Sequence, residues 1–402
     1  MRDWLSDVFR DRPAWMNVAL VFCAFMTFVY VPWDFLWKPA AHDEEVWFGV
    51  LFTGTTAKLL EIPHFIVYAM LTYGLRRMRP WAGTLAAIYS AQIALGMFIW
   101  NLMYLEGWLL PLFVGTVGAI PFILLAFAFW SAEDFREPRG NLRERYGDWA
   151  LVTGASAGIG LEFARALARD HVNLVLTARR EDRLRELATE LEADRGIQTR
   201  VIDYDLSREG AADDLADAVR DLQISILINN AGFGYSGRFD LQDSEKIREL
   251  VTTNCVSPAV LTARLLPAMH ARGRGAVIFT GSVAGRQPLP LHAAYSASKA
   301  FDNFLGEALY VETRDSGVDV LVVEPGSTET EFQAVAGEIA HPGERADRVV
   351  ETALDALGQQ PSVVSGWANY LRALLAERLP SRPLRLYIAR EVMKQQTPPE
   401  LR

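Results

Sequence analysis

Residues 149–160 read Trp-Ala-Leu-Val-Thr-Gly-Ala-Ser-Ala-Gly-Ile-Gly, and this stretch decides the fold. The apolar run 149–152 has the pattern of a short strand, and a helical pattern continues from Gly160 to about Arg169. Between them, Gly154, Gly158 and Gly160 let the backbone approach a pyrophosphate, whose negative charge the helix N-terminus favours. The stretch therefore predicts a dinucleotide-binding turn between a strand and a helix.

The same alternation of strand and helix patterns continues to about residue 365. Further strand patterns lie at residues 172–176, 199–203, 224–228, 276–279, 318–323 and 362–365, with helical patterns between them. Alternating strands and helices form a parallel sheet with helices on both faces. We therefore expect residues 148–365 to form a doubly wound α/β domain, a Rossmann fold, with a cofactor at the point where the strand order reverses.

The end of the second strand indicates which cofactor binds. An acidic residue about 20 positions after the glycines would hold the ribose 2′-hydroxyl of NAD, whereas an arginine accommodates the 2′-phosphate of NADP. Here the strand runs into Thr177-Ala178-Arg179-Arg180, so the acid is missing and arginines are present. NADP(H) is therefore the expected cofactor, with Arg179 as the better candidate and Arg180 either stacked on adenine or solvated.

Three side chains further along the chain have the chemistry of proton transfer. Tyr295 and Lys299 are four residues apart in a helical pattern, so both project from one helix face. An ammonium beside a phenol favours the phenolate and lowers the tyrosine pKa. Ser282 follows the apolar strand 276–279 in a Gly-flanked loop, where α/β sheets present catalytic hydroxyls. A Tyr–Lys pair alone is common on helix surfaces, so the other motifs must support a catalytic role.

These motifs together resemble the short-chain dehydrogenase/reductase family over about residues 148–365. The signatures are Thr-Gly-x-x-x-Gly-x-Gly at 153–160, Asn-Asn-Ala-Gly at 229–232, the serine, tyrosine and lysine set, and Pro-Gly-x-x-x-Thr at 325–330. With the arginines, the resemblance implies a cofactor site made of Gly154, Ser156, Gly158, Ile159, Gly160, Arg179, Arg180, Asp205, Asn230, Ala231, Gly232, Tyr295, Lys299, Pro325, Gly326, Thr328 and Thr330.

The resemblance also implies an oxidoreductase mechanism, with hydride transfer from NADPH to a carbonyl carbon or the reverse. Tyr295 would act as general acid, Ser282 would bond the same oxygen, and Lys299 would lower the tyrosine pKa and hold the ribose. Asn254 would anchor a water-linked proton relay, as the asparagine does in the family. Asp205 would contact adenine, although it could simply be a charge at a helix N-terminus.

The first third of the chain has the composition of a membrane region. Residues 81–105 and 108–132 carry no charged side chain, and Glu106 lies between these two ranges. Residues 14–37 begin with a long apolar run. About 20 apolar residues suffice to cross a bilayer. Residues 46–75 are less regular, because Lys58, Glu61, Pro63 and His64 interrupt them. We expect an all-α transmembrane region over residues 1–147, with four spans if 46–75 is one.

Loop charges orient these expected spans. Arginines precede the first span, follow the second and follow the last, whereas the loops around residues 43–45 and 106 carry almost no Lys or Arg. The positive-inside rule then places both ends in the cytoplasm, as in a bacterial inner membrane or an equivalent one. Glu61 and His64 are three residues apart, so they either form a functional polar wall or proton path, or hold one helix to its neighbours.

The overall composition excludes several classes of function. A formal net charge of -9 in 402 residues gives no basic surface for nucleic acid, and two cysteines provide neither a disulfide framework nor a metal site. Residues 366–402 form a basic, amphipathic tail that could lie on a membrane or pack on a protein surface.

The substrate and the assembly follow less directly from the sequence. A reductase tethered by its own spans suggests a hydrophobic, lipid-like substrate such as a 3-oxoacyl thioester, a keto-sphingoid base or a sterol. The resemblance implies a homodimer, because family members commonly pair through the helices that carry Asn254 and Tyr295. An NADPH-sensing or scaffold protein, with the membrane region as the working part, is the alternative.

Overall fold

A computed structural model describes residues 13–105, 107, 109–132, 140–378 and 381–402. The chain divides into two compact units, Met1–Pro138 and Arg139–Arg402. Each unit is described below on its own. The arginines before residue 13 and between 133 and 139, on which part of the expected orientation depends, lie outside the described residues.

The second unit is built on a seven-stranded parallel sheet with the order β11-β8-β7-β6-β3-β4-β5. The strands are β3 (Trp149–Thr153), β4 (Asn173–Ala178), β5 (Thr199–Asp203), β6 (Ile224–Asn229), β7 (Gly275–Thr280), β8 (Val318–Glu324) and β11 (Ser362–Val364). From β3 the chain builds outward through β4 and β5, and then returns to build the other side from β6. The strand order therefore reverses between β3 and β6, as the Rossmann fold requires.

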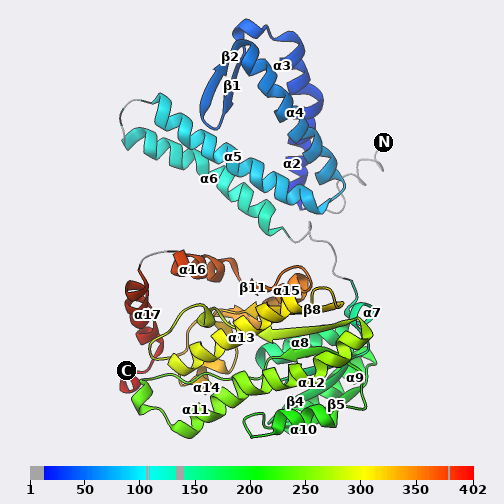
Figure 1. The fold of residues 1–402 in the computed structure, drawn as a ribbon. Helices are drawn as coiled ribbons and strands as arrows, with labels where there is room; N and C mark the ends of the chain where they lie inside the picture. The colour runs from blue at the N-terminus through cyan, green and yellow to red at the C-terminus, as the bar shows by residue number, and fades with distance from the viewer. Residues whose placement is uncertain (1–12, 106, 108, 133–139, 379–380) are drawn as a thin grey trace. The chain divides into compact units, whose positions relative to one another are not determined.

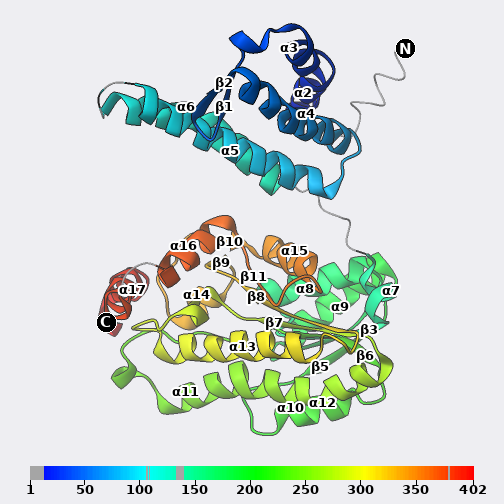
Figure 2. The same cartoon turned by 45° about the horizontal axis from the view of Figure 1, so that its top comes forward.

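Helices cover both faces of this sheet, as Figures 1 and 2 show. One apolar cluster joins the sheet to α8 (Gly158–Arg169), α9 (Glu181–Arg195) and α15 (Ala346–Ala356). A second cluster joins the other face to α10 (Ala211–Ala218), α12 (Ser257–Arg272) and α13 (Ala293–Glu312). The central strand β6 is buried along its whole length, which explains why its sequence is apolar without alternation.

The long helix expected near residues 244–272 contains a local irregularity. The chain forms α11 (Ser244–Val251), one π-helical turn η5 (Thr252–Val256), and then α12. Asn254 lies in that turn and is buried. A π-turn inside a helix often marks a functional site, because it displaces the side chains around it.

The short helix α7 (Leu142–Tyr146) precedes the amino end of β3. The other short elements follow the carboxyl ends of β6, β7 and β8, and they are η4 (Phe239–Leu241), η6 (Val283–Arg286), β9 (Thr328–Glu329), α14 (Phe332–Ala336) and β10 (Glu344–Arg345). The tail forms α16 (Trp367–Arg378), α17 (Arg382–Gln396) and η7 (Pro399–Leu401). The amide of Arg238 donates to Leu401 O at 2.7 Å and that of Ile339 to Gln396 O at 2.8 Å, so the end of the tail is fixed to this unit.

The first unit is mainly helical. It contains α2 (Ala14–Phe25), a π-turn η1 (Met26–Tyr30), α3 (Val31–Trp37), the turn η2 (Ala40–His42), α4 (Gly54–Arg76), α5 (Pro80–Tyr104) and α6 (Leu109–Ser131). A short hairpin, β1 (Glu44–Trp47) with β2 (Val50–Thr53), precedes α4. We did not expect this hairpin from the sequence, and it makes the α4 helix begin at residue 54 rather than 46. The hairpin turn contains Gly49, whose φ of +82° favours glycine.

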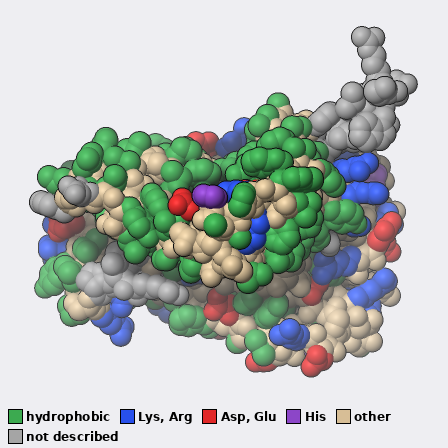
Figure 3. Space-filling view, turned by 90° about the horizontal axis from the view of Figure 1, so that it is seen from above, with side chains coloured by type: hydrophobic (Ala, Val, Ile, Leu, Met, Phe, Trp, Pro, Cys, Tyr) green, Lys and Arg blue, Asp and Glu red, His purple; other side chains and the backbone are tan. Residues whose placement is uncertain are grey.

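Three described helical stretches are long and apolar enough to cross a membrane: Ala14–Trp37, Trp81–Tyr104 and Leu109–Trp130. Helix α4 is not one of them, because its charged residues reduce its hydropathy. The four-span arrangement thus stays a prediction. Hydrophobic side chains such as Phe28, Phe113 and Trp130 are exposed on this unit, and Figure 3 shows a face on which such side chains predominate.

Glu61 and His64 belong to two different polar groups within this unit. Glu61 is buried near Asp34 and Asp43, and its Oε1 lies 3.7 Å from Lys58 Nζ. His64 Nδ1 instead lies 3.1 Å from Tyr89 Oη and 3.7 Å from Glu45 Oε1. These contacts tie α4 to α3, to the hairpin and to α5.

Candidate active site

The glycine turn that follows β3 has the backbone that its sequence requires. Gly154 and Gly158 adopt φ values of +68° and +56°, which other residues rarely adopt. A Cβ at Gly160 would lie 2.3 Å from Gly154 O and 2.5 Å from Asn230 Nδ2. Only glycine at this position therefore lets α8 begin against the turn, with its N-terminus directed at the cavity described below.

Thr153 connects this turn to the Asn-Asn-Ala-Gly segment. Its buried hydroxyl donates to Ile228 O at 3.0 Å and accepts from the amides of Asn230 at 2.9 Å and Ala231 at 3.0 Å. The Asn230 side chain donates back to Thr153 O at 3.0 Å. The ends of β3 and β6 are thus fixed on either side of the point where the strand order reverses.

The two arginines after β4 have different surroundings. Arg180 bonds Ser156 Oγ through Nη2 at 3.1 Å and Glu331 through Nη1 at 2.6 Å. Arg179 is exposed and has no ion-pair partner among the described residues. The unpaired guanidinium of Arg179 is therefore the one available to a phosphate.

Asp205 lies on the cavity wall but also has a local structural role. Its Oδ1 accepts from the amide of Ser207 at 3.0 Å and from the Ser207 hydroxyl at 2.8 Å. Both readings of this residue, adenine contact and turn-forming charge, therefore remain compatible with its position.

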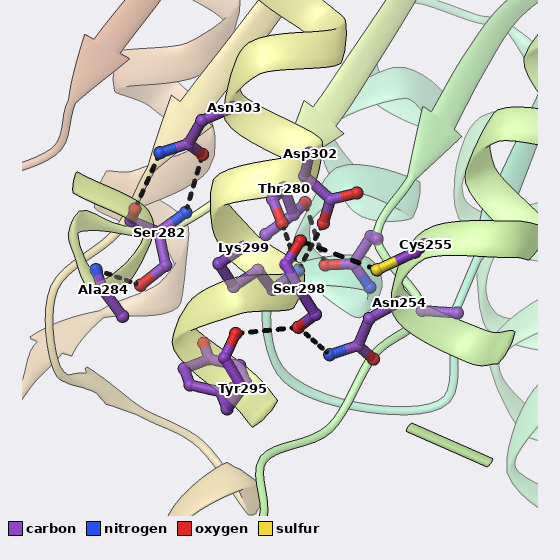
Figure 4. Close-up of polar contacts among 12 residues, drawn as sticks. Asn254, Cys255, Thr280, Ser282, Ala284, Tyr295, Ser298, Lys299, Asp302 and Asn303 are labelled. Carbon is purple, nitrogen blue, oxygen red and sulfur yellow. Dashed lines mark hydrogen bonds and ion pairs between the residues drawn. The ribbon is translucent and has the colours of Figure 1, made fainter. Parts of the chain in front are cut away.

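Ser282 is held by a hydrogen-bond network, and Figure 4 shows its bonds to Asn303 and Ala284. Asn303 accepts from the Ser282 amide at 3.3 Å and donates to Ser282 O at 3.1 Å. The same amide nitrogen of Asn303 donates to Glu324 at 3.0 Å, and Arg286 binds both oxygens of Glu324 at 2.6 Å. The network fixes the backbone of Ser282, while its hydroxyl accepts from the Ala284 amide at 3.0 Å.

Lys299 is buried on α13, one turn after Tyr295, and it is paired with a carboxylate. Its Nζ donates to Thr280 O at 2.7 Å and lies 3.0 Å from Asp302 Oδ2. Burial lowers the Lys299 pKa, but the charges of Asp302 and Tyr295 outweigh that effect, so the pKa is raised and the ammonium is retained.

Burial raises the pKa of Tyr295, and this effect exceeds the lowering by the Lys299 charge and by the Ser282 hydroxyl. The net direction is opposite to what the Tyr–Lys spacing alone predicted, because the sequence does not reveal the desolvation of the phenol. A raised pKa keeps the phenol protonated, which is the form that donates a proton.

Asn254 lies beside α13. Its Nδ2 donates to Phe233 O and to Ser298 Oγ, both at 3.0 Å, and its Oδ1 accepts from the Phe233 amide at 3.1 Å. Because all these bonds are internal, the Asn254 side chain ties the π-turn to α13 and to the loop after β6.

One cavity of about 600 Å³ brings most of the predicted residues together. The predicted residues on its wall are Gly154, Ser156, Gly158, Ile159, Arg179, Arg180, Asp205, Asn230, Ala231, Gly232, Ser282, Tyr295, Lys299, Pro325, Gly326, Thr328 and Thr330. Gly160 and Asn254 are not on the wall, since they lie beneath the glycine turn and behind Ser298.

Several polar residues near this cavity were missed from the sequence. They are Thr153, Arg286, His292, Asp302, Asn303, Glu324 and Glu338. The adjacent Asp302-Asn303 pair inside the α13 pattern could have been noticed, because such residues are unfavourable in helix interiors. The other partners come from distant parts of the chain.

Comparison with known proteins agrees with this geometry. The family model for short chain dehydrogenase matches residues 148–339. The 17-beta-hydroxysteroid dehydrogenase type 3 of Rattus norvegicus is 30% identical over 245 residues, which is 60% of this chain and 80% of that protein. The chain belongs to the short-chain dehydrogenase/reductase family.

Other members of the family show how far the similarity extends. The very-long-chain 3-oxoacyl-CoA reductase of Pyricularia oryzae is 41% identical over 182 residues, 44% of this chain. The chain spans 55% of that reductase's length and 59% of the Bos taurus one. A solved 7beta-hydroxysteroid dehydrogenase structure has a TM-score of 0.59 at 28% identity, and covers 62% of this chain and 99% of its own. A short-chain dehydrogenase from Sphingobium yanoikuyae in complex with NADPH has a TM-score of 0.53 at 34% identity, over 57% of this chain and 93% of its own.

Proposed function

We propose that this protein is a membrane-anchored, NADP(H)-dependent oxidoreductase that reduces a carbonyl group of a hydrophobic, lipid-like substrate, or oxidises the corresponding alcohol. The observation that carries the proposal is the single cavity whose wall contains the glycine turn, Arg179, Ser282, Tyr295 and Lys299.

The residues at one end of this cavity fit NADP(H). The positive φ values of Gly154 and Gly158 open the turn, and a Cβ at Gly160 would fill the space behind it. The N-terminus of α8 can bind a pyrophosphate through its backbone amides, and the guanidinium of Arg179 can donate hydrogen bonds to a 2′-phosphate. The relative from Sphingobium yanoikuyae, which is solved with NADPH, supports this choice of cofactor.

The side chains at the other end have the roles of a proton donor and its support. When bound, NADPH supplies the hydride. Tyr295, protonated because burial raises its pKa, donates its proton to the carbonyl oxygen. Ser282, fixed by Asn303, donates a hydrogen bond to the same oxygen. The Lys299 ammonium stabilises the phenolate that Tyr295 becomes, and Asn254 holds the π-turn against α13.

Membrane attachment and substrate class are proposed together. Three helices with the length and apolarity of membrane spans precede, in the sequence, the second unit (Arg139–Arg402), which we call the catalytic unit. Similar proteins named for very-long-chain 3-oxoacyl-CoA and hydroxysteroid substrates support a lipid-like carbonyl compound. We place the catalytic unit on the cytoplasmic side on the basis of the loop charges.

We further propose that the second unit forms a homodimer through the helices that carry Asn254 and Tyr295, which are the interrupted helix α11–η5–α12 and α13. Apolar residues are exposed on and beside these helices, with Phe304 and Val311 each 69% exposed. A dimer would bury them. The mass of the detergent-solubilised protein, measured by light scattering, would test this, and a monomer would contradict it.

The function is tested by NADPH oxidation with a panel of lipid and small ketones, using the full-length protein in detergent and Tyr295→Phe. We expect turnover that Tyr295→Phe lowers at least about 100-fold, because it removes the proton donor. Tight NADPH binding without turnover of any ketone would instead favour an NADPH-sensing or scaffold role.

A further inference from the structure

A buried acid and imidazole pair lies on the substrate side of the cavity. His292 precedes α13 and is three residues before Tyr295, while Glu338 follows α14. Glu338 Oε1 lies 3.1 Å from His292 Nε2. Both residues line the cavity, and the His292 side chain is only 3% exposed and that of Glu338 only 8% exposed.

Apolar residues line the cavity together with this pair. They include Leu289, Phe332, Val335 and Met393. The Phe332 ring lies 5.2 Å from the Tyr295 ring, measured between centroids, so this wall adjoins the proposed proton donor. A polar pair is therefore placed where a lipid-like substrate alone would require only apolar side chains.

The pair leaves hydrogen-bonding capacity unused. Within the described part of the chain, His292 Nδ1 is a buried atom without a hydrogen-bond partner, and the bond found for the Glu338 carboxylate uses only its Oε1. An ionised carboxylate only accepts, so Nε2 donates to it, and in the neutral ring Nδ1 is then also an acceptor. Leaving a buried acceptor such as Nδ1 unpaired costs free energy unless a donor meets it.

We propose that His292 and Glu338 form a polar subsite that binds a hydrogen-bond donor of the substrate, a hydroxyl or an ammonium group, close to its reacting carbonyl. This inference rests on the proposed function and refines its substrate class. A keto-sphingoid base or a hydroxylated steroid ketone carries such a donor. A 3-oxoacyl thioester presents only acceptors near its 3-oxo group, so it fits this subsite less well.

A purely structural role would be to hold the segment after α14 in place, but other bonds already do so. Ser236 donates its hydroxyl to Ala336 O at 2.9 Å and to Gly337 O at 2.8 Å. The Ile339 amide donates to Gln396 O at 2.8 Å. The segment is thus fixed on both sides of Glu338, which leaves the pair available for recognition.

The test compares three hydrophobic ketones of equal chain length: one with a hydroxyl next to the carbonyl, one with an amine there, and one with neither. The full-length protein in detergent is assayed with NADPH as wild type, as Glu338→Gln and as Glu329→Gln. Glu329, in β9 before α14, is an exposed carboxylate that does not line the main cavity, so it is the control for the loss of a carboxylate charge in this region.

We expect the wild type to prefer a ketone with a donor. Glu338→Gln should reduce the ratio of kcat/KM values, donor ketone over plain ketone, about 10- to 100-fold, chiefly through KM. Glu329→Gln should leave that ratio unchanged. A larger loss for the amine than for the hydroxyl would identify an ammonium as the preferred donor.

Two results would overturn the subsite. One is a wild type with equal kcat/KM values for the three ketones. The other is a Glu338→Gln variant in which all three kcat/KM values fall equally, which would indicate that the pair only holds the fold together. Equilibrium binding of the same ketones to the NADPH-loaded protein gives a second readout. Binding that favours the donor without any turnover would refute the proposed reduction but support the subsite, whereas equal binding would refute the subsite itself.

Discussion

Replacing Thr153 with valine tests whether one hydroxyl holds the two strand ends that flank the cofactor site. Valine has nearly the same shape but cannot accept the Asn230 and Ala231 amides or donate to Ile228 O. Each unpaired amide costs about 1–3 kcal/mol when it is shielded from water. Because both amides are partly buried, we expect Thr153→Val to lower the free energy of unfolding of the catalytic unit by about 2–4 kcal/mol.

The assay is the thermal unfolding midpoint of the full-length protein in detergent, followed together with NADPH binding. A loss of about 2–4 kcal/mol corresponds to a fall of roughly 5–10 °C for a unit of this size. NADPH should bind about tenfold more weakly, since the Asn-Asn-Ala-Gly segment loses its anchor at the cavity wall. Thr153→Ser is the matched control, because it keeps the hydroxyl and loses only a methyl group, which is worth about 1 kcal/mol.

The reasoning would be refuted if Thr153→Val and Thr153→Ser unfolded at the same temperature and bound NADPH equally well. That result would mean that water or a backbone shift satisfies both amides at no cost. A valine variant that lost stability but bound NADPH normally would limit the role of Thr153 to folding.

Two further variants test the charges of the site. Asp302→Asn should cost about 3–5 kcal/mol of stability, because it leaves the buried Lys299 ammonium without its carboxylate at 3.0 Å. The Lys299 pKa is raised above its ordinary 10.5, so this stabilisation is complete below about pH 10.5 and is lost as the pH rises through the folded value. Melting curves from neutral to alkaline pH should therefore show a deficit that shrinks only at the alkaline end, and a constant deficit would contradict the pairing. Arg179→Ala should reduce the preference for NADPH over NADH at least tenfold, measured as a ratio of dissociation constants, and more than Arg180→Ala, whose guanidinium already binds Glu331. An unchanged ratio in Arg179→Ala would show that another group binds the 2′-phosphate.

Local patterns in the sequence were sufficient for the fold of the catalytic unit. Glycines that the chain needs at positive φ, the apolar strands and the Tyr–Lys spacing are all short-range features. They predict the strand, turn and helix over residues 149–169 and the parallel sheet. In a parallel sheet the carboxyl ends of the strands lie at one edge, so most residues of the cavity wall could be predicted from the sequence.

Only the tertiary structure decided the protonation of the site and its supports. Whether Tyr295 gains or loses proton affinity depends on how much water its neighbours exclude, and those neighbours come from several elements. The partners of Ser282, through Asn303, Glu324 and Arg286, meet across gaps of 21 residues or more.

The same limit applies to the pair formed by His292 and Glu338, which are 46 residues apart in the sequence. Nothing local in either segment indicates that they meet. Sequence alone determined which residues could perform hydride-transfer chemistry. The packing of distant segments determined which of them are buried, which are paired, and which buried polar atoms are left without a partner, because burial and pairing are properties of the folded chain and not of any short stretch.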